Sequence, residues 1–303
     1  MKFSAHQLFR TIYFRFSKQE KFLELADVLL DGAQKLIGAQ QFQSGADLSL
    51  LLVEILSKCK FNDADFEKWV ESVAMLIEKI ETNVVERETL IVRAVKWSTE
   101  GNKLNSNQGH PLLHKLIAGV MAKEKNYEQA RYHYLLSKDG VGCAKILIRL
   151  SSKAFSSEID MVIVQVVLNL LILKEKKTAL VTFNTFTKLH PKIQTWNPPY
   201  HTPLLNFLYF LLNIIDEPKL QCFKTLCELY KTALSRDPAY DKQLQQIGVS
   251  YFGAKKATPA RQGGLFGDLF SQLFQELEGD STDEDDSNAA SSSTQFRTNV
   301  DLD

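Results

Sequence analysis

Two of the six histidines, His110 and His114, are spaced i and i+4. On a helix this spacing places both imidazoles on one face, where they could ligate a metal. A metal site needs a third ligand, and metalloprotease motifs place a glutamate beside the first histidine. The sequence offers neither, because His110 precedes a proline at an expected helix start and His114 falls on an apolar face. We therefore expect two structural histidines and no metal.

A second candidate for chemistry is the glycine-containing stretch KDGVGCAK at residues 138–145. A phosphate-binding loop needs the spacing G-x-x-x-x-G-K-[ST] after a strand. Neither the spacing nor a strand is present here. The stretch instead predicts a turn between helices, at which Gly140 or Gly142 allows two helices to approach closely.

The four cysteines, Cys59, Cys143, Cys222 and Cys227, are scattered and form no C-x-x-C pair. Neither a disulfide framework nor a zinc module is indicated, and a reducing compartment is expected. Cys222 and Cys227 are five residues apart, which does not place them on one helical face as a paired site would require. Buried, inert thiols are the default expectation for both. No Ser-His-Asp or Cys-His constellation is evident. The sequence therefore indicates neither an enzyme nor a cofactor.

The elements that carry these residues are predicted to be helices. Only 14 glycines and 8 prolines occur in 303 residues, too few turn residues for an all-β fold. About twelve or thirteen helices of 11–18 residues are expected through residue 252, with no strands. Asn62 or Asp63 is expected to cap a helix whose buried face includes Phe66, Trp69 and Val70.

Further helix starts are predicted from caps. Ser157 and Asp160 form a capping-box pattern, and Thr202-Pro203 and Asp237-Pro238 resemble an N-cap followed by a proline in the first turn. The apolar runs 161–173 and 203–215 are shorter than the ~20 residues that a membrane-spanning helix needs, so both are expected to be buried helices. The N-terminal segment has no continuous apolar core, so no secretory signal is expected. We expect it to form a folded helix, and a mitochondrial presequence is the less favoured alternative.

Helix pairing is predicted from the spacing of Tyr127, Ala130, Tyr134 and Ser137, which is typical of the second helix of a tetratricopeptide-like repeat. Residues 4–16 match the same spacing again through Ala5, Phe9 and Ile12, as a second helix whose first helix is absent. Either the following helix pair covers the apolar side chains of this segment or the chain as given starts late. These side chains are Phe9, Ile12, Tyr13 and Phe16. Because the repeats keep no strict period, the prediction is an all-α fold, an irregular α-solenoid.

The formal charge is zero, from 36 basic and 36 acidic residues, but the charges are unevenly distributed. Residues 262–303 contain ten acidic residues and one basic residue, and the remainder is correspondingly basic. We expect a disordered acidic tail. It would serve either to keep the protein soluble or to regulate it, and in the second case Ser281 and Thr282 are candidate sites for an acidophilic kinase. The apolar stripe at 265–277 predicts a short helix that folds back or, as we favour, binds a partner.

Short segments along the chain resemble a known family, Golgi-to-ER traffic protein 4. Its members are also described as the 35 kDa subunit of the transmembrane-domain recognition complex. The matching segments are Ala5–Thr11, Ala46–Leu50, Glu86–Arg87, Arg93–Ser98, Gly109–His114, Asn126–Glu128, Ala130–Tyr134, Asp139–Cys143, Glu158–Met161, Arg236–Pro238 and Gly263–Gly267. Each segment is short, but they follow in register up to about residue 275.

The resemblance implies a non-enzymatic cytosolic adaptor in the delivery of tail-anchored membrane proteins to the endoplasmic reticulum, with no nucleic-acid binding and no membrane insertion of its own. It implies that residues 1–150 face the targeting ATPase and that 151–254 bind a ubiquitin-like-domain protein or a BAG-family scaffold. Residues 255–303 would be linker, helix and tail. By position, the family's ATPase contacts fall at Phe3, Lys18 and Asp47.

Two departures from the family pattern bear on these expectations. Family members usually have a further helix before the segment that starts here at Phe3, so we expect either an incomplete ATPase-facing surface or a truncated chain. The loop 190–202 is too short for the β-hairpin that clasps the ubiquitin-like subunit in some members, which favours the animal-type arrangement. The alternative is a generic tetratricopeptide-like co-chaperone scaffold that grips partner carboxylates, for which Lys145 and Arg149 are the candidate residues.

Overall fold

The structure, a computed structural model, describes residues 2–100, 108–152, 154–193 and 198–254. The described helices belong to one compact unit, Met1–Ala254. The apolar stripe at 265–277, Ser281 and Thr282 lie outside the described residues, so the predictions made for them stay predictions.

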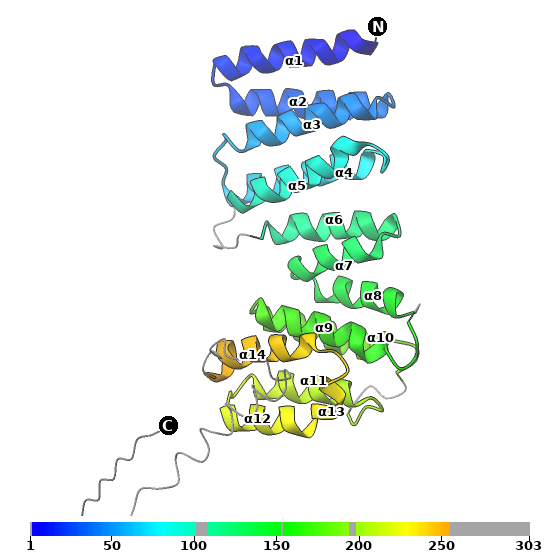
Figure 1. Ribbon diagram of the computed structural model, residues 1–303. Helices are drawn as coiled ribbons and strands as arrows, with labels where there is room; N and C mark the ends of the chain where they lie inside the picture. The colour runs from blue at the N-terminus through cyan, green and yellow to red at the C-terminus, as the bar shows by residue number, and fades with distance from the viewer. Residues whose placement is uncertain (1, 101–107, 153, 194–197, 255–303) are drawn as a thin grey trace, which may run out of the picture. The chain divides into compact units, whose positions relative to one another are not determined.

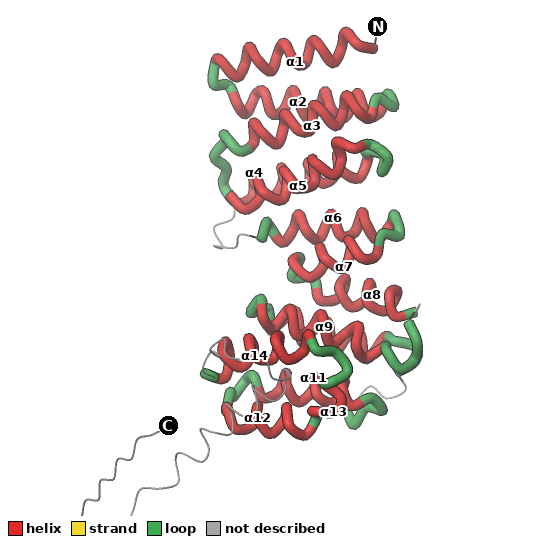
Figure 2. Tube along the Cα trace, viewed as in Figure 1, coloured by secondary structure: helices red, strands yellow, loops and turns green. Residues whose placement is uncertain are grey.

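The described residues form fourteen helices and no strand, which confirms the predicted all-α fold (Figure 2). The N-terminal seven are α1 (Lys2–Lys18), α2 (Phe22–Gly38), α3 (Phe42–Leu56), α4 (Asp63–Lys79), α5 (Val85–Glu100), α6 (Pro111–Lys123) and α7 (Tyr127–Leu136). The remaining seven are α8 (Gly140–Ser151), α9 (Ile159–Ile172), α10 (Lys176–Leu189), α11 (Pro203–Ile214), α12 (Leu220–Leu229), α13 (Lys231–Leu234) and α14 (Ala239–Phe252).

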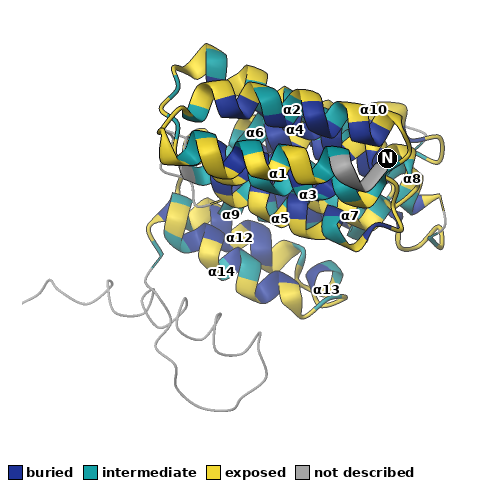
Figure 3. Ribbon diagram, turned by 90° about the horizontal axis from the view of Figure 1, so that it is seen from above, coloured by how far each residue is buried: buried dark blue, intermediate teal, exposed yellow. Residues whose placement is uncertain are grey.

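Consecutive helices pack as antiparallel hairpins, and the hairpins stack into a solenoid with α1 at one end and α11–α14 at the other (Figure 1). The closest hairpins are α2 with α3, α6 with α7, and α9 with α10, and α8 also packs on α10. Contacts of α3 with α5 and of α4 with α6 join successive hairpins. Seen along the stack, α2 and α4 lie on one side and α3 and α5 on the other (Figure 3).

Helix α4 shows how a predicted apolar face becomes core. Asn62 caps it by accepting a hydrogen bond from the Asp65 backbone N–H at 2.8 Å. Phe66 and Val70 are buried as predicted, but Trp69 is only half-buried and lies at the edge of that face. In the repeat-like helix α7, Ala130 is fully buried and lets α6 approach, as the spacing predicted.

Five of the turns between the described helices place a non-glycine residue in the left-handed region, and four of these share the same closing hydrogen bond. Glu20, Gln40, Lys125 and Lys174 have φ between 56° and 63°, in the left-handed region. Each follows the end of a helix, and the next residue donates its N–H back to a carbonyl of the last turn, as Gln41 does to Leu36 at 2.9 Å. Each non-glycine residue in this conformation costs ~1 kcal/mol, which the paired backbone groups and helix packing offset.

Both apolar runs form buried helices, α9 and α11, as predicted. Among the described helices, none combines the length and apolar character required to cross a bilayer. The capping box at Ser157 and Asp160 is a wrong prediction, because α9 begins at Ile159 without a side-chain cap. Asp160 is instead 1% exposed and binds Arg236, which lies in the segment before α14.

The two proline junctions differ. Thr202 is the N-cap of α11 and Pro203 its first residue, as predicted, although the threonine hydroxyl accepts no cap hydrogen bond. Helix α14 starts one residue later than expected, with Pro238 at the N-cap position. Asp237 still accepts a hydrogen bond from the Ala239 backbone N–H at 2.9 Å, so its side chain caps the helix from one position earlier.

Candidate partner-binding surface

The residue Asp47, predicted as a partner contact, lies on α3 and is held by two side chains of α1. His6 Nε2 is 2.7 Å from one carboxylate oxygen, and Arg10 Nη2 is 3.1 Å from the other. The Asp47 side chain remains 30% exposed, and Arg10 is 51% exposed. We call His6, Arg10 and Asp47 the α1–α3 charge cluster. It presents a partly neutralised, solvent-facing surface at the N-terminal end of the stack.

The other two predicted contacts lie on α1 but apart from this cluster. Lys18 is exposed at the last residue of α1, eight residues beyond Arg10 and therefore about 12 Å further along the helix axis. Phe3 lies in the first turn of α1, and its side chain is outside the described part. The structure thus places all three residues at one end of the stack, and no hydrogen bond or ion pair joins Lys18 to Asp47. Their role as ATPase contacts stays a prediction.

Sequence reasoning missed His6 and Arg10. They are 41 and 37 residues from Asp47 along the chain, and only the packing of α1 on α3 brings them together. A second polar link between the same helices joins Tyr13 Oη to Glu54 at 2.8 Å. Burial, with the hydrogen bond to Glu54, raises the pKa of Tyr13 to about 12. The α1–α3 contact is therefore made by oriented polar pairs as well as by apolar packing.

The apolar residues of α1 face the following hairpin. Tyr13 is buried, and Phe9, Ile12 and Phe16 are half-buried. A Cβ placed on Gly32 of α2 would lie 2.6 Å from the Phe9 ring, so this glycine permits the close approach of the two helices. The following helix pair therefore covers this face of α1 in part. The outer side of α1 exposes Leu8 and Phe14, at 59% and 64%.

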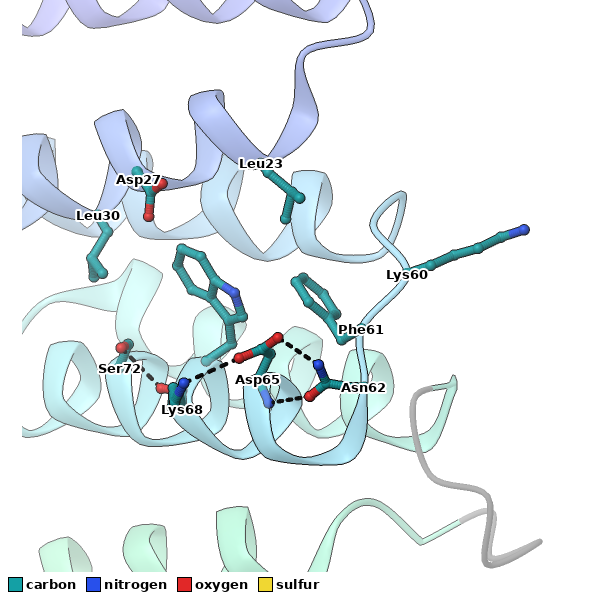
Figure 4. Close-up of a pocket in the computed structure, with 10 residues that line it drawn as sticks. Leu23, Asp27, Leu30, Lys60, Phe61, Asn62, Asp65, Lys68 and Ser72 are labelled. Carbon is teal, nitrogen blue, oxygen red and sulfur yellow. Dashed lines mark hydrogen bonds and ion pairs between the residues drawn. The ribbon is translucent and has the colours of Figure 1, made fainter.

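On the opposite row of helices, a groove of about 400 Å³ separates α2 from α4 (Figure 4). We call it the α2–α4 groove. Its apolar lining consists of Leu23 and Leu30 from α2, and Phe61 and Trp69 from the α4 side. The rings of Phe61 and Trp69 are 6.2 Å apart and tilted by 47°. Leu23 is 54% exposed, so the groove presents apolar surface to solvent.

The charges around the groove are arranged asymmetrically. Asp65 binds Asn62 at 2.7 Å and Lys68 at 3.1 Å, and these hydrogen bonds lower the pKa of Asp65, with the one to Lys68 contributing most. Lys60 extends away from the groove, and Asp27 points from α2 toward α4 (Figure 4). No other residue of the described ranges pairs with Asp27. Sequence analysis missed this groove, because its two walls are about 40 residues apart.

The two candidate metal-binding histidines have structural roles. His110 caps α6 through Nδ1, which accepts a hydrogen bond from the Leu112 N–H at 3.3 Å. His114 donates from Nε2 to the Gln108 carbonyl at 2.6 Å, so its Nδ1 accepts from His133 Nδ1 at 2.8 Å. Burial lowers the pKa of His114, and with the proximity of His114 it lowers that of His133 to about 4. Within the described ranges, no cluster of three metal-ligating side chains occurs.

Lys138 and Asp139 form the predicted turn between α7 and α8, whereas residues 140–145 are the first residues of α8. Asp139 caps α8 by accepting from the Gly142 N–H at 2.9 Å. A Cβ on Gly140 would lie 2.8 Å from the Thr178 carbonyl oxygen of α10, so this glycine lets α8 and α10 meet. The segment therefore serves packing between helices.

All four cysteines are free thiols. Cys143 and Cys227 are buried, and burial raises the pKa of each to about 12, which keeps both protonated and unreactive. Cys222, expected to be buried, is exposed. The expectation was wrong because a separation of five residues rotates the two side chains of α12 about 140° apart, and only one side of α12 faces the core.

Comparison with known proteins agrees with this architecture. A sequence profile of the family described as Golgi to ER traffic protein 4 matches residues 19–274. The Golgi to ER traffic protein 4 homologues of Bos taurus and Homo sapiens are each 42% identical, over 94% and 90% of this chain and 87% and 82% of theirs.

The chain belongs to the Golgi to ER traffic protein 4 family.

A solved structure has the same fold. The structure described as "Crystal structure of C. therm. Get4" superposes with a TM-score of 0.76 at 22% identity, covering 94% of this chain and 93% of that one. Membership in the Golgi to ER traffic protein 4 family, with a shared helical solenoid, confirms the resemblance noted from the sequence. The α1–α3 charge cluster and the α2–α4 groove are then surfaces of a member of a family named for protein traffic.

Proposed function

We propose that this protein is a non-enzymatic cytosolic adaptor in the targeting of tail-anchored membrane proteins to the endoplasmic reticulum. In this proposal the N-terminal half, residues 1–150, engages the targeting ATPase. The C-terminal half, residues 151–254, holds a ubiquitin-like-domain protein or a BAG-family scaffold. Membership in a family named for Golgi-to-ER traffic is the observation that carries the proposal.

The stacked architecture supports two separate binding surfaces. The α1–α3 charge cluster and Lys18 lie at one end of the stack, and α11–α14 form the other (Figure 1). The C-terminal half exposes large apolar side chains, with Phe155 77% and Leu229 75% exposed. Apolar side chains of this size contribute most to affinity when a partner covers them. An extended solenoid can hold one partner at each end simultaneously.

Affinity for the purified ATPase tests the N-terminal assignment. The double variant Lys18→Glu and Asp47→Lys reverses both proposed charges, and we expect weaker binding, most of all at low salt where screening is least. The matched control exchanges Asp31 and Lys35, an exposed ion pair at 2.6 Å on α2, so it also leaves the net charge unchanged. Equal affinity of the double variant and the control would refute the assignment.

Co-purification from cytosol tests the adaptor role as a whole. Full-length protein should recover both the targeting ATPase and a ubiquitin-like or BAG-family protein, and recovery of neither would overturn the proposal. Leu229→Glu, which places a charge on an exposed apolar position of α12, should release the C-terminal partner and retain the ATPase. The reverse pattern would contradict the assignment of the two halves.

A co-chaperone scaffold that grips partner carboxylates is the second candidate. Lys145 and Arg149 are both exposed on one face of α8, and no acidic side chain of the described residues pairs with either. Titration with acidic C-terminal peptides separates the two functions. Binding that is lost in Lys145→Ala would favour the scaffold, and binding that this variant leaves unchanged would exclude this site.

A further inference from the structure

The α2–α4 groove has the features of a peptide-binding site that the proposed function does not use. It runs between two packed helices, and Leu23 and Trp69 both leave apolar surface open to solvent. Its volume of about 400 Å³ falls in the range of protein sites that bury a small ligand or a few side chains. A groove between helices is a common seat for an amphipathic helix of a partner.

The charge that faces the groove determines which partner fits. Lys68 and Asp65 satisfy each other, and Lys60 extends away from the groove (Figure 4). Asp27 is exposed, points toward α4 and forms no ion pair with another described side chain. The available charge is therefore negative, beside an indole ring that leaves part of its surface exposed. A carboxylate next to an aromatic face is complementary to a cation.

We propose that the α2–α4 groove binds a helical segment of a partner protein that presents an arginine and a leucine one turn apart. The guanidinium stacks on the Trp69 indole and pairs with Asp27, and the leucine packs against Leu23 and Phe61. Arginine fits better than lysine, because its planar group can stack on a ring while it pairs with a carboxylate, and it is more weakly hydrated than an ammonium group.

This surface is separate from the α1–α3 charge cluster. Asp47 lies on α3 and turns toward α1, whereas the groove is formed by α2 and α4 in the other row of helices (Figure 3). The two surfaces can therefore be occupied at the same time. The groove adds a third binding surface to those of the proposed function and does not depend on the identity of the other partners.

A pair of designed peptides tests the proposal on the full-length protein. The first is a capped alanine-rich helical peptide with leucine at one position and arginine four residues later, and the second has glutamine in place of the arginine. The tryptophans are labelled with ¹⁵N, and the indole N–H signal of Trp69 is identified by its absence in Trp69→Phe. Trp97, which is 4% exposed, serves as an internal reference.

The arginine peptide should shift the Trp69 signal and leave the Trp97 signal in place. It should bind about three- to tenfold more tightly than the glutamine peptide, which is the expected contribution of one exposed ion pair and one cation–π contact. Asp27→Asn should remove this preference. Asp31→Asn, one turn further along α2 and outside the groove, should keep it.

Three results would overturn the proposal. Equal binding of the two peptides would show a purely apolar groove, and an unchanged preference in Asp27→Asn would place the arginine elsewhere. The absence of any Trp69 shift with the arginine peptide at about 1 mM, the range of weak peptide affinities, would show that the groove is not a binding site for this class of segment.

Discussion

Arg236 Nη1 lies 3.1 and 3.0 Å from the two carboxylate oxygens of Asp160 and joins the start of α9 to the segment that precedes α14. Arg236 also donates from Nη2 to the Ser157 carbonyl. Asp160 is 1% exposed, whereas Arg236 is 33% exposed. The arginine thus satisfies a buried carboxylate and closes the C-terminal layer of the stack. Removing Arg236 would leave a buried carboxylate without a partner, whereas removing Asp160 would leave a guanidinium that still reaches solvent.

Arg236→Ala should lower the free energy of unfolding by about 3 kcal/mol, because it leaves the Asp160 carboxylate buried and unpaired. The measurement is urea unfolding at pH 7 followed by circular dichroism. The double variant Asp160→Asn and Arg236→Gln is the control, since it removes both charges, and it should recover most of the loss. A loss of less than about 0.5 kcal/mol in Arg236→Ala would show that the pair contributes no more than a surface ion pair.

Asp241→Asn should stabilise the protein at neutral pH. Asp241 is 4% exposed, neither carboxylate oxygen has a partner among the described residues, and burial raises its pKa from 3.8 to about 6. A raised carboxyl pKa means that folding favours the protonated form, so stability is lost as the pH rises from about 4 to 6. The difference between the variant and the natural protein should grow across this interval and stay constant above it. If the variant and the natural protein differed in stability by the same amount at pH 4 and pH 7, the raised pKa of Asp241 would be contradicted.

The His114–His133 pair should make the protein acid-sensitive. The pKa of His133 is about 4 in the folded protein and 6.5 in the unfolded chain. Because the folded state resists protonation, stability should fall as the pH drops from 6.5 to 4. His133→Asn keeps a donor close to His114 Nδ1 but does not titrate, so it should flatten this part of the stability profile. Burial also lowers the pKa values of His110, His114 and His190, so a residual slope of the same sign should remain.

Gly140→Ala and Gly119→Ala should have opposite effects. The new Cβ at Gly140 would lie 2.8 Å from the Thr178 carbonyl and force α8 from α10, at a cost of about 1–3 kcal/mol. At Gly119, inside α6, a new Cβ would meet no side chain or neighbouring helix within 4 Å, so alanine should stabilise by about 0.5–1 kcal/mol through helix propensity alone. Thermal unfolding of both variants measures the difference. Equal midpoints would show that the α8–α10 contact yields without strain.

The helices could be predicted from the sequence because their signals are local. Apolar periodicity, the Asn62 cap and the small residue Ala130 each act within a few turns of one helix. Contacts between residues that are distant in sequence could not be predicted in this way. Asp160 matched a local capping box, but its partner is Arg236, 76 residues away. His6 and Arg10 meet Asp47 only across a helix interface, and the α2–α4 groove exists only when two helices stack.

The position of α1 has a further consequence for how the N-terminal surface responds to a partner. Among the described helices, α1 has its main packing contacts with α2 and α3 alone. Because a solenoid gains its stability from nearest neighbours, the end helix opens at a lower free energy than the helices inside the stack. Amide hydrogens of α1 should then exchange with solvent sooner than those of α9. A partner that holds α1 in place would slow this exchange even where it touches no exchanging amide, so deuterium uptake reports docking without a label on either protein.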